Sequence, residues 1–195
     1  MLTKRLQDYH LILASGSPRR HHFFKELDLE FTIDVRPVDE TFPKELKREA
    51  ITDHLAQLKA TGFSDIQPHE IIVTSDTIVV KDGIPIGKPQ DKAEAIEMLK
   101  NLSGDMHEVI TSVCFTGADF QKTVNDTTKV WFKELSDEEI EYYLSTYEPY
   151  DKAGSYGIQE WIGYIGIERL EGCYFNVMGL PTRLVYKTLM ELTSP

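Results

Sequence analysis

Hydrophobic and polar positions follow one another along this chain with two spacings, one typical of strands and one typical of helices. Short apolar runs bounded by polar residues predict strands at 10–14, 31–35 and 71–80. Apolar residues three and four positions apart predict amphipathic helices at 19–27, 44–61 and 91–102. Two β-prone runs are separated by a short glycine-containing turn, so we expect an antiparallel hairpin at 107–116 and 121–132.

The C-terminal part of the chain continues this alternation. Ser136 followed by Glu139 is a capping-box pattern, which predicts the start of a helix. Short strands are expected between 158 and 175, and a last helix from 181 to about 192. Because strands and helices interleave while a hairpin also occurs, the sequence predicts an α/β fold with helices flanking a mixed central sheet, as a single domain over 1–195.

The loop after the first predicted strand is the first candidate for chemistry. Ser15, Gly16 and Ser17 precede a helix whose positive N-terminal end attracts anions, and Arg19 adds a forked, permanently charged group. These features predict phosphate binding, although the spacing of a Walker loop is absent. The structural alternative is that Ser17-Pro18 only starts a helix and the arginines lie on the surface.

Asp76 is the second candidate, because a carboxylate within an otherwise apolar strand is costly to bury unless a cation meets it. In a phosphate site it could bind a divalent metal or accept a proton from an attacking water. The alternative is that the strand ends near Thr74 and Asp76 lies in an exposed turn.

Weaker signals come from single charged or amide side chains. Glu40 could ligate a metal, and Lys59 and Lys88 could neutralise phosphate charge, although such residues are usually solvated. Gln159 follows a glycine-containing run that suggests a tight loop, and its amide offers the donor and acceptor needed to read a nucleobase edge. The histidines show no metal-ligand spacing, and we interpret His21 and His22 as a surface or cleft-edge pair.

Composition narrows the function classes. The chain has 195 residues with 21 Lys and Arg against 32 Asp and Glu, a net charge of −11, which argues against binding a nucleic acid polymer but leaves room for a small polyanion held by local cations. Apolar runs long enough for a membrane span or a signal peptide are lacking, so we expect a cytoplasmic protein. Cys114 and Cys173 are too isolated to suggest a zinc site or a disulfide framework, and we expect both in the core.

Taken together, the motifs occur in an order that resembles the Maf family of nucleotide pyrophosphatases, also called septum-formation inhibitors. The segments that carry the resemblance are LASGSPRR at 13–20, SDT at 75–77, GKP at 87–89, LSG at 102–104, DKAGSYGIQ at 151–159 and VMGLP at 177–181. The resemblance extends from about residue 11 to the last predicted helix. It implies a mixed-sheet α/β fold with two lobes around a cleft, similar to inosine triphosphate pyrophosphatases.

The resemblance also implies roles for individual residues. The family's catalytic carboxylate corresponds to Asp76, and its substrate-selecting positions correspond to Arg19, Thr77 and Gln159. Its remaining charged positions correspond to Glu40, Lys59 and Lys88. The YGIQ run ending at Gln159 resembles the dTTP/UTP branch, whereas the 7-methyl-GTP branch has an acidic residue there.

The reaction implied is metal-dependent hydrolysis of dTTP or UTP, or of a modified pyrimidine nucleotide, to the monophosphate and pyrophosphate. Mg²⁺ or Mn²⁺ would bind Asp76 and Glu40, phosphates would contact Ser15, Ser17, Arg19, Lys59 and Lys88, and a homodimer would be the assembly. The alternative is a non-catalytic nucleotide-sensing or cell-division interaction protein, which would not need Asp76 beside phosphate. A P-loop phosphotransferase is disfavoured because the Walker lysine is missing.

Overall fold

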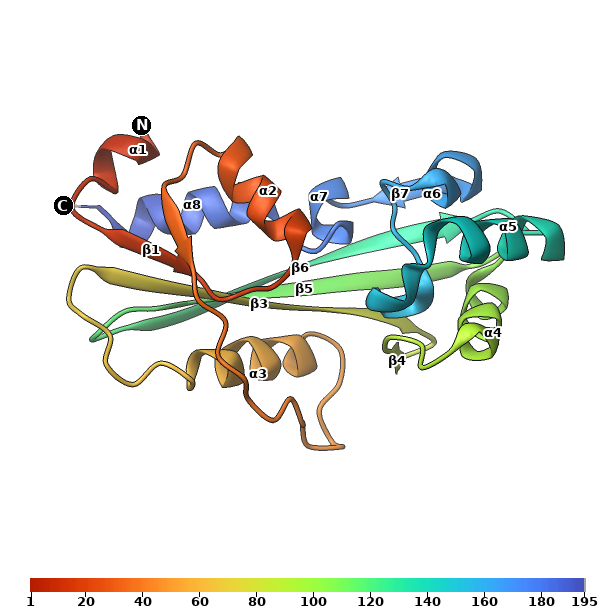
Figure 1. Ribbon diagram of the computed structural model, residues 1–195, viewed down its shortest axis with the longest axis horizontal. Helices are drawn as coiled ribbons and strands as arrows, with labels where there is room; N and C mark the ends of the chain where they lie inside the picture. Colours follow the sequence, from red (N-terminus) through yellow and green to blue (C-terminus); the bar gives the residue numbers. More distant parts are fainter. Residues whose placement is uncertain (195) are drawn as a thin grey trace. The chain divides into compact units, whose positions relative to one another are not determined.

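The computed structural model describes residues 1–194, which form two compact units (Figure 1). Unit 1 contains Met1–Asp76, Thr111–Asp126 and the segment from Gly179 onwards, and unit 2 contains Thr77–Ile110 and Thr127–Met178. Three long strands continue from one unit into the other: β3 (Glu70–Lys81), β5 (Met106–Thr116) and β6 (Gln121–Phe132). Neither unit is therefore a contiguous piece of the chain.

The strands form one sheet in the order β2-β1-β3-β5-β6-β7, with β4 paired to β3. β1 (His10–Leu13) runs parallel to β2 (Phe31–Ile33) and to β3. β4 (Ile84–Ile86) is antiparallel to β3, and β7 (Ile167–Glu171) is antiparallel to β6. The prediction of a mixed central sheet with flanking helices is confirmed.

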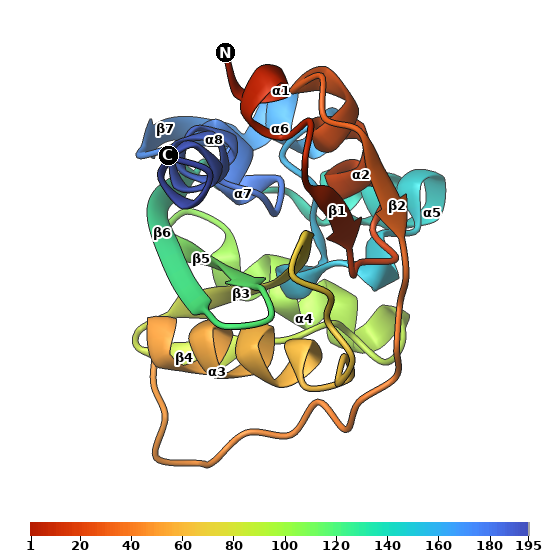
Figure 2. The same ribbon diagram turned by 90° about the vertical axis from the view of Figure 1, so that its left-hand side faces the viewer.

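Helices cover both faces of the strands in unit 1. The helices α1 (Leu2–Arg5), α2 (Pro18–Glu26) and α8 (Thr182–Leu192) lie over one face, and α3 (Glu49–Ala60) lies over the other (Figures 1 and 2). Strands covered on both faces bury successive residues, which explains why β1 and the start of β3 read as continuous apolar runs. Ile12 and Ile72 pack with Phe63, the residue that follows α3 in the chain after a short turn.

Unit 2 has its own core. α4 (Lys92–Leu102) packs against α5 (Asp137–Tyr147) and against the 3₁₀ turn η2 (Ala153–Ser155), which follows η1 (Pro149–Asp151). Leu99, Leu102 and Tyr143 are fully buried between these elements. The predicted capping box of α5 is confirmed, because the Ser136 side chain accepts from Glu139 N and the Glu139 side chain accepts from Ser136 N.

Two predicted elements differ from the structure. The strands expected between 158 and 175 are only partly present, because Trp161–Gly166 forms α6 and Tyr174–Val177 forms α7, on either side of β7. The β-prone side chains of α6 are overruled by packing: Ile162 is buried, and a Cβ on Gly163 would overlap the Ile158 carbonyl. The helix expected from residue 44 begins at Glu49, because Arg48 directly before it has a positive φ of 52°, which does not fit an α-helix.

β3 is unbroken through Asp76, so the alternative in which the strand ends near Thr74 is wrong. Cys114 is buried and Cys173 is half-buried, and both are free thiols. Within residues 1–194, no helix has both the length and the apolar character needed to cross a bilayer.

Candidate functional site

The loop between β1 and α2 contains a hydrogen bond of its own. Ser17 N donates to Ser15 Oγ over 3.2 Å, and Ser17 is the N-cap of α2 without its side chain accepting a capping bond there. Gly16 has no left-handed backbone, and a Cβ added to it would meet no protein atom within 4 Å. Neither backbone strain nor protein packing requires glycine at this position, so the free space suits a ligand that approaches the backbone.

Arg20 fastens this loop to two distant segments of unit 1. Its Nε donates to the Gly179 carbonyl over 2.9 Å, and its Nη1 donates to the Ser75 carbonyl over 3.0 Å and to Ser15 Oγ over 3.4 Å. A planar guanidinium can make these bonds together because its donors point in fixed, divergent directions. The side chain thereby joins the loop, β3 and the start of the C-terminal segment.

The surroundings of Arg20 show which charges lie near it. Burial lowers the pKa of Arg20 to about 10, and Arg19 also lowers it, whereas the carboxylates of Asp76 and Glu40 raise it. The guanidinium therefore stays charged at neutral pH. Two cations and two carboxylates consequently share one neighbourhood in unit 1.

Lys59 lies between those two carboxylates. Its Nζ is 2.6 Å from Asp76 Oδ1 and 3.0 Å from Glu40 Oε2. The side chains of Asp76 and Lys59 are mostly buried, at 13% and 18% exposed, whereas Glu40 is 55% exposed. Asp76 is thus a buried carboxylate with a cationic partner, as the sequence led us to expect of a charge within an apolar strand.

The residues predicted for the site divide between the two units. Unit 1 brings together Ser15, Ser17, Arg19, Glu40, Lys59 and Asp76. Thr77, Lys88 and Gln159 belong to unit 2. Thr77 directly follows Asp76 in β3, Lys88 is exposed after β4, and Gln159 is half-buried after η2.

A divalent cation is implied by the family resemblance, and the donor set of unit 1 fits one. Mg²⁺ in nucleotide enzymes is commonly bound by one or two carboxylates, with phosphate oxygens and waters completing its coordination. Asp76 and Glu40 supply two carboxylates that converge on one cation, the Lys59 ammonium. The described residues contain no cluster of three or more His, Cys, Asp or Glu side chains arranged for a metal, so a nucleotide's phosphates would have to complete the shell.

Two contacts in the loop were missed by sequence reasoning. Arg20 was seen only as the neighbour of Arg19, because its carbonyl partners lie 55 and 159 residues away in the chain. His21, interpreted as a surface or cleft-edge residue, is half-buried and its Nε2 contacts the Ser15 carbonyl. The unusual run of charged residues opening α2 was the only signal for either contact.

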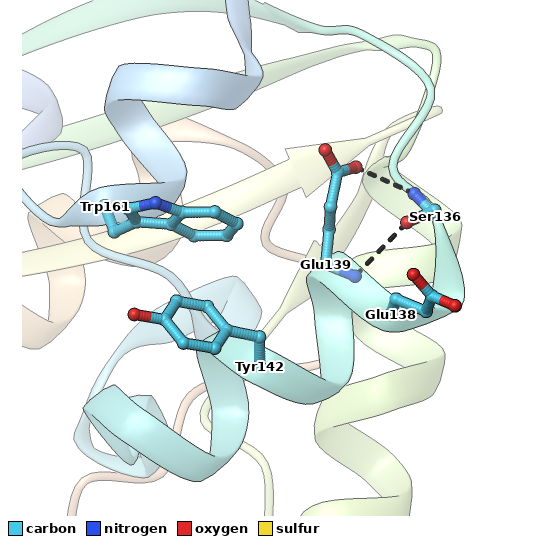
Figure 3. Close-up of a pocket in the computed structure, with 5 residues that line it drawn as sticks. All are labelled: Ser136, Glu138, Glu139, Tyr142 and Trp161. Carbon is cyan, nitrogen blue, oxygen red and sulfur yellow. Dashed lines mark hydrogen bonds between the residues drawn. The ribbon is translucent and has the colours of Figure 1, made fainter.

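A separate hollow of about 430 Å³ lies in unit 2 and contains none of the predicted site residues (Figure 3). It is lined by Ser136, Glu138, Glu139, Tyr142 and Trp161. The Glu139 carboxylate accepts a hydrogen bond from Ser136 N in the capping box and lies 2.8 Å from Lys133 Nζ. The hydrogen bonds from Lys133 and Ser136 lower the pKa of Glu139 below its usual value. The ring of Tyr142 lies edge-on to Trp161 with centroids 4.8 Å apart. Ser136 is the N-cap of α5, Glu138, Glu139 and Tyr142 lie in α5, and Trp161 begins α6.

The fold and the unit 1 site together define an α/β protein with a serine- and arginine-bearing loop beside a mostly buried carboxylate–lysine pair. Residues 10–192 match the family described as Maf-like protein, and the chain belongs to that family. The family resemblance drawn from the sequence motifs is confirmed.

Relatives cover nearly the whole chain. It is 55% identical to the dTTP/UTP pyrophosphatase of Christiangramia forsetii, over 98% of both chains. It is 52% identical to the dTTP/UTP pyrophosphatase of Flavobacterium johnsoniae, over 98% of this chain and 100% of the relative. Among solved structures, a HAM1 protein from Coxiella burnetii matches with a TM-score of 0.51 at 12% identity, covering 94% of this chain and 99% of that one, and supports the fold alone.

Proposed function

We propose that this protein is a nucleoside triphosphate pyrophosphatase that hydrolyses dTTP and UTP to the monophosphate and pyrophosphate. The observation that carries the proposal is Asp76, a mostly buried carboxylate held by Lys59 beside the Ser15 loop. Relatives 52% and 55% identical over nearly their whole lengths bear the name dTTP/UTP pyrophosphatase, which supports the same substrates here.

In this proposal the cationic side chains and the loop bind the triphosphate. Backbone amides at the start of α2 and the Arg19 guanidinium donate to phosphate oxygens, and Lys88 adds a further positive charge. Lys59 can move its ammonium from a carboxylate to phosphate without leaving its place on α3, since its three donors rotate freely. These contacts strengthen as charge develops on the departing pyrophosphate.

Asp76 acts on the water. Its carboxylate accepts a proton from the water that attacks the α-phosphorus, or orients that water in line with the leaving group. Before the nucleotide binds, Lys59 holds the Asp76 carboxylate through the 2.6 Å contact. Arg20 holds the Ser75 carbonyl, which fixes the backbone directly before Asp76. Gln159 selects the base.

A bound Mg²⁺ or Mn²⁺ would supply charge neutralisation and polarisation of the phosphate oxygens, with Asp76 and Glu40 holding it. The same proposal includes a cytoplasmic location, a homodimeric assembly and no nucleic acid polymer as partner. The last of these rests on the net charge of −11.

The decisive experiment measures pyrophosphate and monophosphate release from dTTP, UTP, CTP and GTP, with Mg²⁺, with Mn²⁺ and with a chelator. We expect release from dTTP and UTP that the chelator abolishes. The variant Asp76→Asn keeps the shape of the side chain but removes its charge and basicity, so we expect kcat to fall at least about a hundredfold.

The exposed Asp65 provides the matched control, because Asp65→Asn changes the same functional group in unit 1 at a residue that has no assigned role in the site. Asp65→Asn is expected to retain wild-type turnover. Near-normal turnover by Asp76→Asn would refute the role of Asp76. Nucleotide binding without turnover by the wild-type protein would favour the nucleotide-sensing alternative.

A further inference from the structure

Gln159 is held against its own loop in unit 2. A Cβ added to Gly157 would lie 2.8 Å from Gln159 Nε2 and 3.0 Å from Glu160 Oε1, so both side chains fold over the space that glycine leaves. Gln159 Nε2 is 3.5 Å from Glu160 Oε1, with the amide nitrogen as donor. The glycine thus makes room for a contact between two neighbouring side chains.

Glu160 is itself fixed by two further donors. The Tyr143 hydroxyl donates to Glu160 Oε2, and Lys152 Nζ lies 3.1 Å from Glu160 Oε1. Tyr143 is fully buried and its hydroxyl accepts from Gly157 N over 3.0 Å. Burial, followed by the bond to Glu160, raises the pKa of Tyr143, so the phenol keeps the proton that it donates.

A glutamine amide alone cannot distinguish uracil from cytosine. Uracil and thymine offer a donor at N3 and an acceptor at O4, whereas cytosine offers an acceptor at N3 and a donor at N4. An amide has one donor end and one acceptor end, so turning it by half a rotation matches it to either pattern. Discrimination requires the amide to be fixed one way round.

In the structure, the Glu160 carboxylate determines which end of the Gln159 amide faces it. An ionised carboxylate only accepts hydrogen bonds, so the amide end that faces Glu160 has to be the nitrogen. The oxygen of Gln159 is then the end that is available to a base. One hydrogen of Nε2 serves Glu160, and the other remains for a carbonyl such as O4.

We propose that Glu160, anchored by Tyr143 and Lys152, is a positioning residue that keeps the Gln159 amide oxygen as the acceptor for N3–H, and so favours uracil and thymine over cytosine. The inference rests on the proposed function, because it takes Gln159 as the residue that reads the base. It goes further in assigning the discrimination against cytosine to a side chain that does not itself contact the nucleotide.

The test compares UTP with CTP, and dTTP with dCTP, by kcat/KM for the wild-type protein and for Glu160→Gln. The substituted amide can donate as well as accept, so it no longer forces the orientation of Gln159. We expect the UTP-to-CTP ratio of kcat/KM to fall at least about tenfold, mainly through a lower KM for CTP. Glu97→Gln, an exposed glutamate on α4, is the matched control and is expected to keep the wild-type ratio.

A second variant and a binding readout keep the outcome clear. Tyr143→Phe removes one hydrogen-bond donor to Glu160 but leaves the charge of Glu160 in place, so we expect a smaller fall in the UTP-to-CTP ratio. If Glu160→Gln does not fold, the result for Tyr143→Phe tests the proposal. Affinities for UMP and CMP, measured by titration calorimetry, test the same discrimination without turnover. A wild-type protein that turns over no triphosphate would refute the proposed function, whereas ratios unchanged in a folded variant would refute the role of Glu160.

Discussion

At the scale of single residues, Arg20 is the side chain on which the unit 1 site depends for its shape. It bonds to carbonyls of β3 and of the segment before α8, and it also reaches the Ser15 hydroxyl. Arg19, its neighbour in α2, is half-buried, and its charge lowers the pKa of Arg20. The sequence alone does not show which of the two adjacent arginines makes these bonds, because their bonding partners lie far away in the chain.

We expect Arg20→Lys to weaken both the fold and the reaction, even though it conserves the charge. An ammonium cannot reproduce the divergent Nε and Nη1 bonds, so at least one buried carbonyl loses its donor. The free energy of unfolding, measured with urea, is expected to fall by about 1–3 kcal/mol. In the same variant kcat/KM for dTTP is expected to fall at least about tenfold.

Arg5→Lys is the control for this substitution. Arg5 Nη1 also donates to a carbonyl, that of Met190, but on the exposed surface of the protein. We expect Arg5→Lys to change the free energy of unfolding by less than about 0.5 kcal/mol. Equal effects of the two substitutions would show that Arg20 has no special structural role.

At the scale of elements, local patterns predicted a segment correctly where the residues of that segment alone determine its structure. The strand–loop–helix around Gly16, the capping box at Ser136 and the hairpin of β5 and β6 follow from spacing and turn chemistry. Local patterns failed at α6, where packing overrules strand propensity, and at Arg48, where a residue with positive φ precedes the start of α3. Side-chain partners such as Tyr143 and Glu160 were also invisible, because α5 and the η2 loop meet only after folding.

One substitution in the loop between β1 and α2 can separate an effect on stability from an effect on substrate binding. Gly16→Ala places a Cβ in open space on a backbone that other residues adopt, so we expect the free energy of unfolding to stay the same or rise by up to about 1 kcal/mol. If phosphate occupies that space, KM for dTTP is expected to rise about tenfold or more. Urea unfolding and steady-state kinetics of one preparation measure both quantities.

Gly172→Ala gives the opposite pattern and serves as the comparison. Its φ is +131°, and a Cβ there would lie 2.7 Å from Thr128 Oγ1. We expect this variant to lose about 1–3 kcal/mol of stability with little change in KM. A wild-type KM in Gly16→Ala would mean that no ligand atom approaches the loop backbone.

At the scale of the whole molecule, the two units are tied together by covalent continuity. β3 passes from one unit to the other between Asp76 and Thr77, and β5 and β6 cross the boundary as well. The catalytic carboxylate of the proposal and a residue assigned to substrate selection are therefore adjacent in one strand. The chain crosses the boundary between the units three times within strands, although each unit has a core of its own.

We expect the two units to unfold together. Both tryptophans, Trp131 and Trp161, belong to unit 2, so their fluorescence reports on that unit, whereas far-ultraviolet circular dichroism reports on both. Because three strands are shared, the two signals should change at the same urea concentration. Midpoints that differ between the two probes would show that the units unfold independently.

Gly157 has a consequence for how sequences of this kind can diverge. A side chain at that position would occupy the space now filled by the amide of Gln159 and the carboxylate of Glu160, so the three positions constrain one another. A lineage that gains a larger residue at 157 has to give up the carboxylate at 160 or displace it. We therefore expect positions 157 and 160 to vary together among those relatives that keep a glutamine at position 159.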